Sequence, residues 1–386
     1  MNFLLHLPAF VKVLAAFGAI LLIYRLKIPL WLSVAASAAA LSLWSGTGIN
    51  GLGATVGALV LPENYLLVVA IGLLLLFNEA LTKSGRMTRT IDALKAYVAS
   101  RRTLYAALPA LIGLLPMPGG ALFSAPMVDS LDDKQEIKPE LKVAINYWFR
   151  HIWEYWWPLY PGVVLAIRYS GLPAPLYFAI QLPLTFAAIA GGYFFILRKI
   201  APSKTRDKNS RPDIAAIAST LLPIFIIVVC TIAGIFVFPR LNIVPALANL
   251  CALGIGLLSA LCVVFISKPA SVKGAFSIFV HRHTWSLIAL VLAIQFFSAV
   301  IVHPVGPQSA TLVSLMRDEF LHLGVPFLLV MMLIPFISGF VTGIAFAFVG
   351  ASFPLIFGLL DPEMPLHVRM AAAVLSYGCG YLGMIL

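Results

Sequence analysis

Hydrophobic positions along the chain gather into long runs, and polar positions fall in short segments between them. Runs of about 17–25 apolar residues bounded by charges are typical of membrane-spanning helices. The composition agrees, because 61% of the 386 residues are hydrophobic and only 11% are charged. Soluble domains carry about a quarter charged residues, so we expect a polytopic, all-α membrane protein. The expected spans are Leu4–Tyr24, Ile28–Trp44, Tyr65–Leu81, Leu141–Ile167, Leu176–Leu197, Ile214–Phe238, Val244–Ile266, Trp285–Val302 and Met370–Leu386.

The stretch Leu104–Val128 is apolar but is broken at its centre by Pro116, Pro118, Gly119 and Gly120. If it crossed the membrane once, two basic segments with six Lys or Arg each, 83–102 and 198–211, would face opposite sides. Short cytoplasmic loops are normally the basic ones. If the stretch dips in and returns, twenty Lys and Arg face one side and four the other. We therefore expect a re-entrant hairpin over 104–131, open to the cytoplasm, and an N-terminus outside. The formal charge of +11 needs no nucleic-acid partner, because these loops explain it.

A second apolar stretch, Val325–Leu360, is too long for one span and short for two. Its centre holds Ser338, Gly339, Thr342 and Gly343, which favours a second hairpin over 325–360, open to the outside. Two ordinary short helices are the alternative. Each hairpin would reach only mid-membrane, where irregular backbone must face protein or a wet cavity.

The predicted elements occur as two series of opposite polarity, an arrangement typical of secondary transporters. Residues 1–200 would form the first inverted repeat, 201–213 a cytoplasmic basic linker, and 214–386 the second repeat. The second series lacks a counterpart of the last span, so we expect the natural chain to continue for about one more helix. Tyr147, after the first hairpin, corresponds in this scheme to Tyr377, after the second.

Candidate chemistry lies in "NYWFRHIWEYWWPLYPG", where Asn146, Tyr147, Arg150, His151 and Glu154 share an arc of about 140° if the segment is helical. Ionisable residues inside a membrane are costly and usually line a functional cavity. Arg150 would bind an anion, and His151 or Glu154 would carry a proton. The alternative is a fixed ion pair between Arg150 and Glu154.

Helix ends at the hairpin tips would add backbone N–H and C=O groups to this site. Ser124, Ser338, Thr342 and Ser376 could add hydroxyl ligands, although each could instead bond its own helix carbonyl. An enzyme alternative uses Asp129, Asp132, Asp133 and Glu136 to hold Mg²⁺ for a lipid diphosphate, although we favour a solvated hairpin exit. The sequence has no zinc-protease, nucleophile-elbow or P-loop motif, and its four cysteines have no metal-ligand spacing. We expect neither a cofactor nor a metal.

The motifs "LLPMPGGALFSAPMVD", "NYWFRHIWEYWWPLYPGV" and "LSYGCGYLGMIL" resemble the prokaryotic membrane family called domain of unknown function 401. That family is grouped in the ion transporter superfamily with gluconate, citrate and arsenite permeases. The resemblance implies an inverted repeat with two hairpins and a homodimer in which a transport domain slides against a scaffold, as in an elevator. In the family a Ser-Pro-Val-His stretch and another helix follow the last motif. The Ser-Asn-Thr motifs of its sodium-coupled dicarboxylate branch are absent here, so that specificity is not implied.

We therefore expect a secondary active transporter of the cytoplasmic membrane. Its partners would be a small organic anion, a coupling cation (H⁺ or Na⁺), the lipid bilayer and a second copy. A cation/proton antiporter that uses Glu154 is the alternative within transport.

Overall fold

The computed structural model describes residues 7–115, 120–132, 135–202, 213–268, 271–305, 309–361 and 363–386, which form helices and no strand. Proline precedes or opens most of the long helices, where its fixed φ is suited to the first turn and its missing N–H costs nothing. The helices are α2 (Ala9–Arg25), α3 (Leu30–Trp44), α4 (Gly48–Gly57), α5 (Pro62–Lys83), α6 (Arg86–Tyr97), α7 (Arg101–Gly113), α8 (Gly120–Asp129), α9 (Pro139–Arg150), α10 (Pro161–Ser170), α11 (Ala174–Phe195), α12 (Ile214–Val237), α13 (Pro245–Ser267), α14 (Ser271–Phe276), α15 (Arg282–Val302), α16 (Leu312–His322), α17 (Phe327–Thr342), α18 (Ala345–Leu359) and α19 (Leu366–Ile385).

Six helical segments of the described chain are long and apolar enough to cross a membrane. They lie in α5, α11, α12, α13, α15 and α19. The helical class and these six of the expected spans are confirmed, with edges that differ by a few residues. Within the expected span Leu141–Ile167, a helix over Leu141–Trp157 with a break at Pro158, Pro161 and Gly162 was expected. The break is present, but the first helix, α9, already ends at Arg150, and α10 begins at Pro161. The short helices α4, α6, α14 and α16 were not expected.

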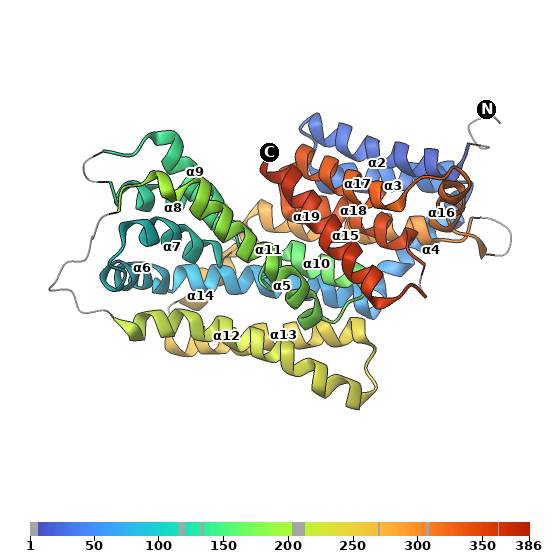
Figure 1. Cartoon of the computed structure of the whole chain (residues 1–386). Coiled ribbons are helices and arrows are strands. Elements are labelled where there is room, and N and C mark those ends of the chain that lie inside the picture. Colours follow the sequence, from blue (N-terminus) through green and yellow to red (C-terminus); the bar gives the residue numbers. More distant parts are fainter. Residues whose placement is uncertain are drawn as a thin grey trace.

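The long helices run side by side, so that the bundle has two ends (Figure 1). One end, at the left of Figure 1, carries α6, α14 and the start of α12. We call it the basic end, because the segment from Lys83 to Arg102 lies there. The other end carries α4 and α16. The pair α7–α8 lies toward the basic end and the pair α17–α18 toward the opposite end (Figure 1).

The order of elements repeats along the chain. A helix pair (α2–α3, later α12–α13) is followed by a short helix (α4, α14), a long helix (α5, α15) and a second short helix (α6, α16). Two helices separated by a short interruption (α7–α8, α17–α18) and a further helix (α9, α19) complete each series. Contacts between the series are reciprocal, since α3 packs on α15 while α13 packs on α5, and α2 packs on α16 while α12 packs on α6.

Two of these reciprocal contacts are polar. The Glu319 carboxylate on α16 accepts hydrogen bonds from the backbone N–H groups of Ala9 (2.8 Å) and Phe10 (2.7 Å) at the start of α2. The residue before α2 is Pro8, which offers no capping side chain, so Glu319 satisfies donors that a helix N-terminus leaves open. At the other end, the Thr90 hydroxyl of α6 lies 2.7 Å from that of Thr220 on α12.

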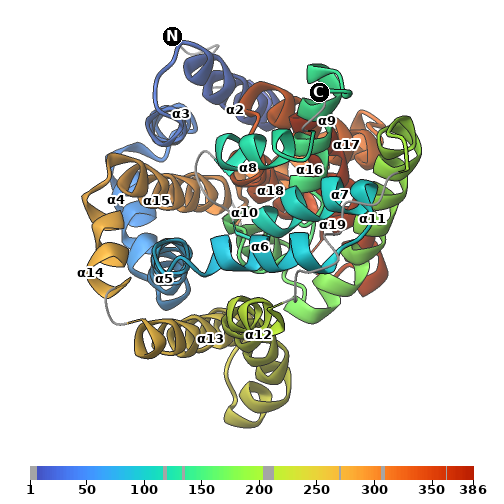
Figure 2. The same cartoon turned by 90° about the vertical axis from the view of Figure 1, so that its left-hand side faces the viewer.

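Seen from the basic end, α6, α7, α8 and α9 lie in front, and the pair α12–α13 projects to one side (Figure 2). The most extensive packing in the molecule joins α17 to α19. A Cβ atom on Gly339 would collide with the carbonyl oxygen of Gly380, and one on Gly383 with that of Phe336. The two helices therefore approach backbone to backbone, which is the usual role of small residues between membrane helices.

Candidate functional site

Three breaks between successive helices frame the candidate site. The first separates α7 from α8, and the second, residues 151–160, separates α9 from α10. The third lies at Gly343, which ends α17 with a positive φ of 65° before α18 begins at Ala345. Residues 151–160 contact the end of α7, and the start of α10 contacts the start of α18.

The segment 151–160 caps the C-terminus of α7. The indole N–H groups of Trp153 and Trp157 donate to the carbonyl oxygens of Ala110 (2.8 Å) and Leu114 (2.9 Å). The Tyr160 hydroxyl donates to the carbonyl oxygen of Gly113 over 2.5 Å. The last carbonyls of a helix have no partner within it, and leaving them buried and unpaired would be costly. Three aromatic side chains thus fix where α7 ends.

The same segment is held on its other side by α11 and α19. The hydroxyls of Tyr377 and Tyr381 donate to the carbonyl oxygens of Glu154 (2.5 Å) and His151 (2.8 Å). The Thr185 hydroxyl donates to the carbonyl oxygen of Ile152 over 2.7 Å. Non-helical backbone is therefore satisfied by protein donors, as an interior without water requires.

Two glycines bring helix ends that flank these breaks into direct contact. A Cβ on Gly113, the last residue of α7, would collide with the carbonyl group of Arg150, the last residue of α9. A Cβ on Gly162, near the start of α10, would meet the backbone of Phe346 and Ala345 at 3.1–3.3 Å. The end of α9 therefore contacts the end of α7, and the start of α10 contacts the start of α18.

The candidate charged residues lie in the segment between α9 and α10 or directly before it. Asn146 and Arg150 are on α9, buried and half-buried, but α9 ends at Arg150. His151 and Glu154 follow in turns, so the expectation that all of them share one helical face is wrong. The turns begin at His151, and hydroxyl groups of α11 and α19 donate to the carbonyl oxygens of this segment. The Glu154 carbonyl would have no partner even in a continuous helix, because Pro158 lacks an N–H.

The turns nevertheless bring His151 and Glu154 together. His151 Nε2 lies 3.8 Å from Glu154 Oε1, and His151 Nδ1 lies 2.5 Å from the carbonyl oxygen of Tyr147. Glu154 is only 7% exposed. A cavity lined by Tyr147, His151, Tyr155 and Tyr381 has a volume of only about 10 Å³, the space of one water molecule.

The candidate hydroxyls divide into two groups. Ser338 and Ser376 are fully buried, and their Oγ atoms have no hydrogen-bond partner among the described residues. Thr342 donates to the carbonyl oxygen of Ser338 over 2.7 Å, so it bonds its own helix, the alternative weighed for each hydroxyl. Helices α17 and α19 are antiparallel, with Gly339 opposite Gly380 and Phe336 opposite Gly383. Continued along both helices, this register places Ser376 of α19 level with Gly343 at the end of α17.

The remaining candidates have other positions. Ser124 is buried on α8, and Gly120 opens that helix, whereas Pro118 and Gly119 lie outside the described residues. Tyr377 is fully buried, and its ring packs against Phe348, with 5.4 Å between ring centroids. It positions the backbone of Glu154 by the hydrogen bond described above.

Sequence reasoning missed the residues that organise the site, namely Trp153, Trp157, Tyr160, Thr185 and Tyr381. The density of aromatic side chains in "WEYWWPLY" was the available signal, because Trp and Tyr usually find a hydrogen-bond partner when buried. Asn78 on α5 is also buried, at 5% exposed, and its amide atoms have no partner among the described residues.

In the acidic run after α8, Asp129 and Glu136 are exposed, as in a solvated exit, but Asp132 is buried in an ion-pair cluster. Asp132, whose side chain is fully buried, lies 2.8 Å from Arg101 and 2.9 Å from Lys142. Its oxygens also accept the N–H groups of Glu136 and Ile137, both over 3.0 Å. Burial alone would raise the pKa of Asp132, but Lys142 and these N–H groups outweigh it, so the pKa lies below its ordinary value.

The cluster joins the start of α7, the end of α8 and the start of α9, since Arg101 also pairs with Glu136 (2.9 Å) and Lys142 with Asp129 (2.7 Å). Protein donors occupy both oxygens of Asp132, which disfavours it as a Mg²⁺ ligand. Asp133 lies outside the described residues. In the part of the chain that the structure describes, no three His, Cys, Asp or Glu side chains come together to hold a metal ion.

Comparison with known proteins gives one result. A family model described as "Protein of unknown function (DUF401)" matches residues 10–386. The chain belongs to the DUF401 family. No curated protein matches the sequence. Membership of DUF401 and the six apolar helices fit a membrane protein.

Proposed function

We propose that this DUF401 protein is a secondary active transporter that moves a small organic anion, most simply a carboxylate, across the cytoplasmic membrane by alternating access. The observation that carries the proposal is the non-helical segment with His151 and Glu154, which directly follows Arg150 and contacts the end of α7. Paired broken helices in two series of elements, with the substrate held between them, are the signature of such transporters.

The arrangement of the two series supports an inverted repeat. Elements recur in the same order, their contacts are reciprocal, and the two interrupted pairs lie toward opposite ends of the bundle (Figure 1). On this proposal α7–α8 and α17–α18 are re-entrant hairpins from the cytoplasm and the outside. The basic end then faces the cytoplasm, and the N-terminus lies outside.

Arg150 is proposed to bind the anion, because a guanidinium matches the planar geometry of a carboxylate. Ser338 and Ser376 are proposed as hydroxyl ligands, since their buried Oγ atoms have no partner among the described residues. The space beside His151 holds about one water molecule. Substrate therefore enters only when one interrupted pair moves, and the state described here is closed.

Proton coupling has its basis in the pair formed by His151 and Glu154. Glu154 is buried, and its Oε1 lies 3.8 Å from His151 Nε2. Two ionisable side chains this close together in the interior of the bundle are suited to carry a proton. The same observation favours the second candidate, a cation/proton antiporter in which Glu154 binds the cation and proton alternately.

The test is uptake into proteoliposomes. Acetate, lactate, succinate, citrate and gluconate are first screened by the thermal shift of the purified protein at several pH values, and those that stabilise it are then supplied as labelled substrates. We expect Arg150→Ala to abolish anion uptake, while Arg89→Ala, an exposed arginine of α6, leaves it intact. Anion uptake that Arg150→Ala does not change would remove Arg150 from the site.

The driving ion is identified with the same vesicles. A pH gradient with Na⁺ replaced by choline drives uptake if H⁺ is coupled, and a Na⁺ gradient at uniform pH drives it if Na⁺ is coupled. Glu154→Gln should abolish the response to pH in the first case. Cation-dependent proton efflux without any anion uptake would favour the antiporter instead.

A further inference from the structure

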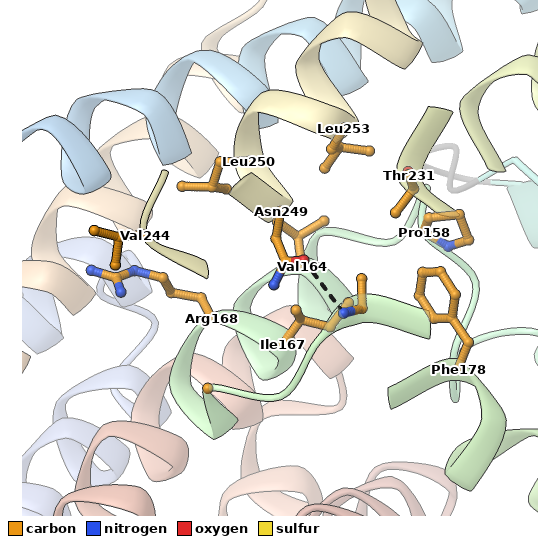
Figure 3. A pocket seen from close by; sticks show the side chains of 12 residues that line it. Pro158, Val164, Ile167, Arg168, Phe178, Thr231, Val244, Asn249, Leu250 and Leu253 are labelled. Atoms are coloured by element: carbon orange, nitrogen blue, oxygen red, sulfur yellow. Dashed lines mark hydrogen bonds between the residues drawn. The ribbon is translucent and has the colours of Figure 1, made fainter. Parts of the chain in front are cut away.

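A second cavity lies where α10 and α11 meet α12 and α13, and it touches the proposed transport site only through Pro158 (Figure 3). Its volume is about 260 Å³. Protein interiors are packed so closely that voids larger than a water molecule are few, so a space of this size calls for an occupant. Most of its wall is hydrocarbon, contributed by Val164, Ile167, Phe178, Leu250 and Leu253 among others.

The polar side chains of the deep wall are already satisfied. The Thr231 hydroxyl donates to the carbonyl oxygen of Ile227 over 2.8 Å, within its own helix. Asn249 accepts the N–H of Ala174 and donates to the carbonyl oxygen of Leu172, both over 3.4 Å (Figure 3). Water needs two to four polar partners to settle in a cavity, and this wall offers few. The cavity suits a hydrocarbon chain.

The mouth of the cavity differs from its interior. It is lined by Arg168 near the end of α10, by Gly171 and by Val244 directly before α13, and Val244 is 59% exposed. These are helix ends at the opposite end of the bundle, where lipid headgroups lie if the protein spans the membrane. Leu253 lies about eight residues along α13 from the mouth, so the cavity is roughly 12 Å deep at 1.5 Å per residue.

Arg168 supplies a charge at this mouth that is only weakly neutralised. Its guanidinium lies 4.0 Å from Glu63, at the limit of an ion pair, and within the described chain this is its one such partner. In Figure 3 its side chain extends along the mouth toward Val244. Arginine is well suited to phosphate because its planar donors can bind two oxygens at once.

We propose that this cavity is a phospholipid-binding site, with one acyl chain inserted between α10–α11 and α12–α13 and the phosphate held by Arg168. The bilayer supplies the ligand, because α11 and α12 are the spans with the largest exposed share and expose apolar side chains such as Phe186 and Phe225. A lipid here would wedge the pair α12–α13 against α10, the helix that follows the proposed transport site.

The experiment measures lipid bound to the purified full-length chain by native mass spectrometry. We expect the wild-type protein to keep one phospholipid per chain and, after delipidation, to bind dioleoyl-phosphatidylglycerol at least tenfold more tightly than dioleoylglycerol, which has the same tails without a phosphate. Leu253→Trp should fill the cavity and abolish binding. Leu258→Trp, on the exposed side of the same helix, should bind as the wild type does.

Arg168→Gln tests the headgroup separately and creates no packing problem. It should remove the preference for the phospholipid over the diacylglycerol, while Arg240→Gln, an exposed arginine outside the cavity, should keep it. Two results would overturn the proposal: equal lipid binding by Leu253→Trp and wild type, or an unchanged preference in Arg168→Gln. Neither result bears on anion uptake.

Discussion

Replacement of Gly113 by alanine tests the contact on which the proposed site depends. Gly113 ends α7, and a Cβ there would collide with the carbonyl group of Arg150. The obstacle is backbone, which cannot rotate away as a side chain can. The added methyl group must therefore push α7 away from α9 and stretch the hydrogen bonds from Trp153, Trp157 and Tyr160.

The magnitude follows from two terms. Overpacking of a tight contact costs about 1–3 kcal/mol. Each weakened hydrogen bond forfeits up to about 0.5–1.5 kcal/mol. Alanine is the better helix former by up to about 1 kcal/mol, although less at a helix end. We expect a net loss of about 2–4 kcal/mol. At roughly 2 °C per kcal/mol for a chain of this size, Tm falls by about 4–8 °C.

Gly72→Ala is the matched control. Gly72 lies inside α5, and a Cβ there would meet no atom within 4 Å. The same substitution should therefore stabilise the protein by about 0.5–1 kcal/mol. Thermal unfolding in detergent is followed by intrinsic fluorescence, to which Trp153 and Trp157 contribute directly at the affected contact. If Gly113→Ala were as stable as Gly72→Ala, α7 and α9 would not be in contact at Gly113 and Arg150, and the proposed arrangement of the site would be refuted.

Two further predictions concern the basic end and the opposite end. Asp132→Asn breaks two ion pairs of a buried carboxylate. Arg101 still pairs with Glu136 and Lys142 with Asp129, and both of these acids face water, so we expect the free energy of unfolding to fall by about 2–3 kcal/mol, the low end of the range for buried pairs. Glu136→Gln, at the exposed rim, should lower it by under about 1 kcal/mol. Because the pKa of Asp132 is lowered in the folded protein from an ordinary value of 3.8, its stabilisation is complete above about pH 5 and is lost as the pH falls through the folded pKa. Tm measured against pH should therefore fall more steeply in acid for the wild type than for Asp132→Asn, and parallel curves would contradict this account. At the opposite end, Glu319→Gln should lower the free energy of unfolding by about 1–2 kcal/mol, because an amide has one acceptor oxygen for two N–H groups and no charge to interact with the dipole of α2. The substitution of its neighbour, Asp318→Asn, should lower it far less. Equal Tm values for the two variants would refute the capping role.

The sequence predicted elements better than it predicted the site. Apolar runs of membrane length gave spans close to α5, α11, α12, α13, α15 and α19, because in lipid the helix must satisfy its own backbone. The Pro and Gly residues near 116–120 and 338–343 correctly marked the ends of α7 and α17. Periodicity failed at His151 and Glu154, because α9 ends at Arg150 and the carbonyls that follow bond hydroxyl donors on distant helices. The burial of Asp132 could not be predicted either, because it requires the ion pairs with Arg101 and Lys142, and only the fold brings these residues near it.

The reciprocal packing of the two series has a consequence for assembly. The long helix of each half packs most extensively on the other half, α5 on α13 and α14 and α15 on α3. An emerging chain would therefore hold its first half unfinished until residues beyond 280 had been made. If the gene is divided within the basic linker, each fragment should be degraded when it is expressed alone, and the two should be stable when they are expressed together.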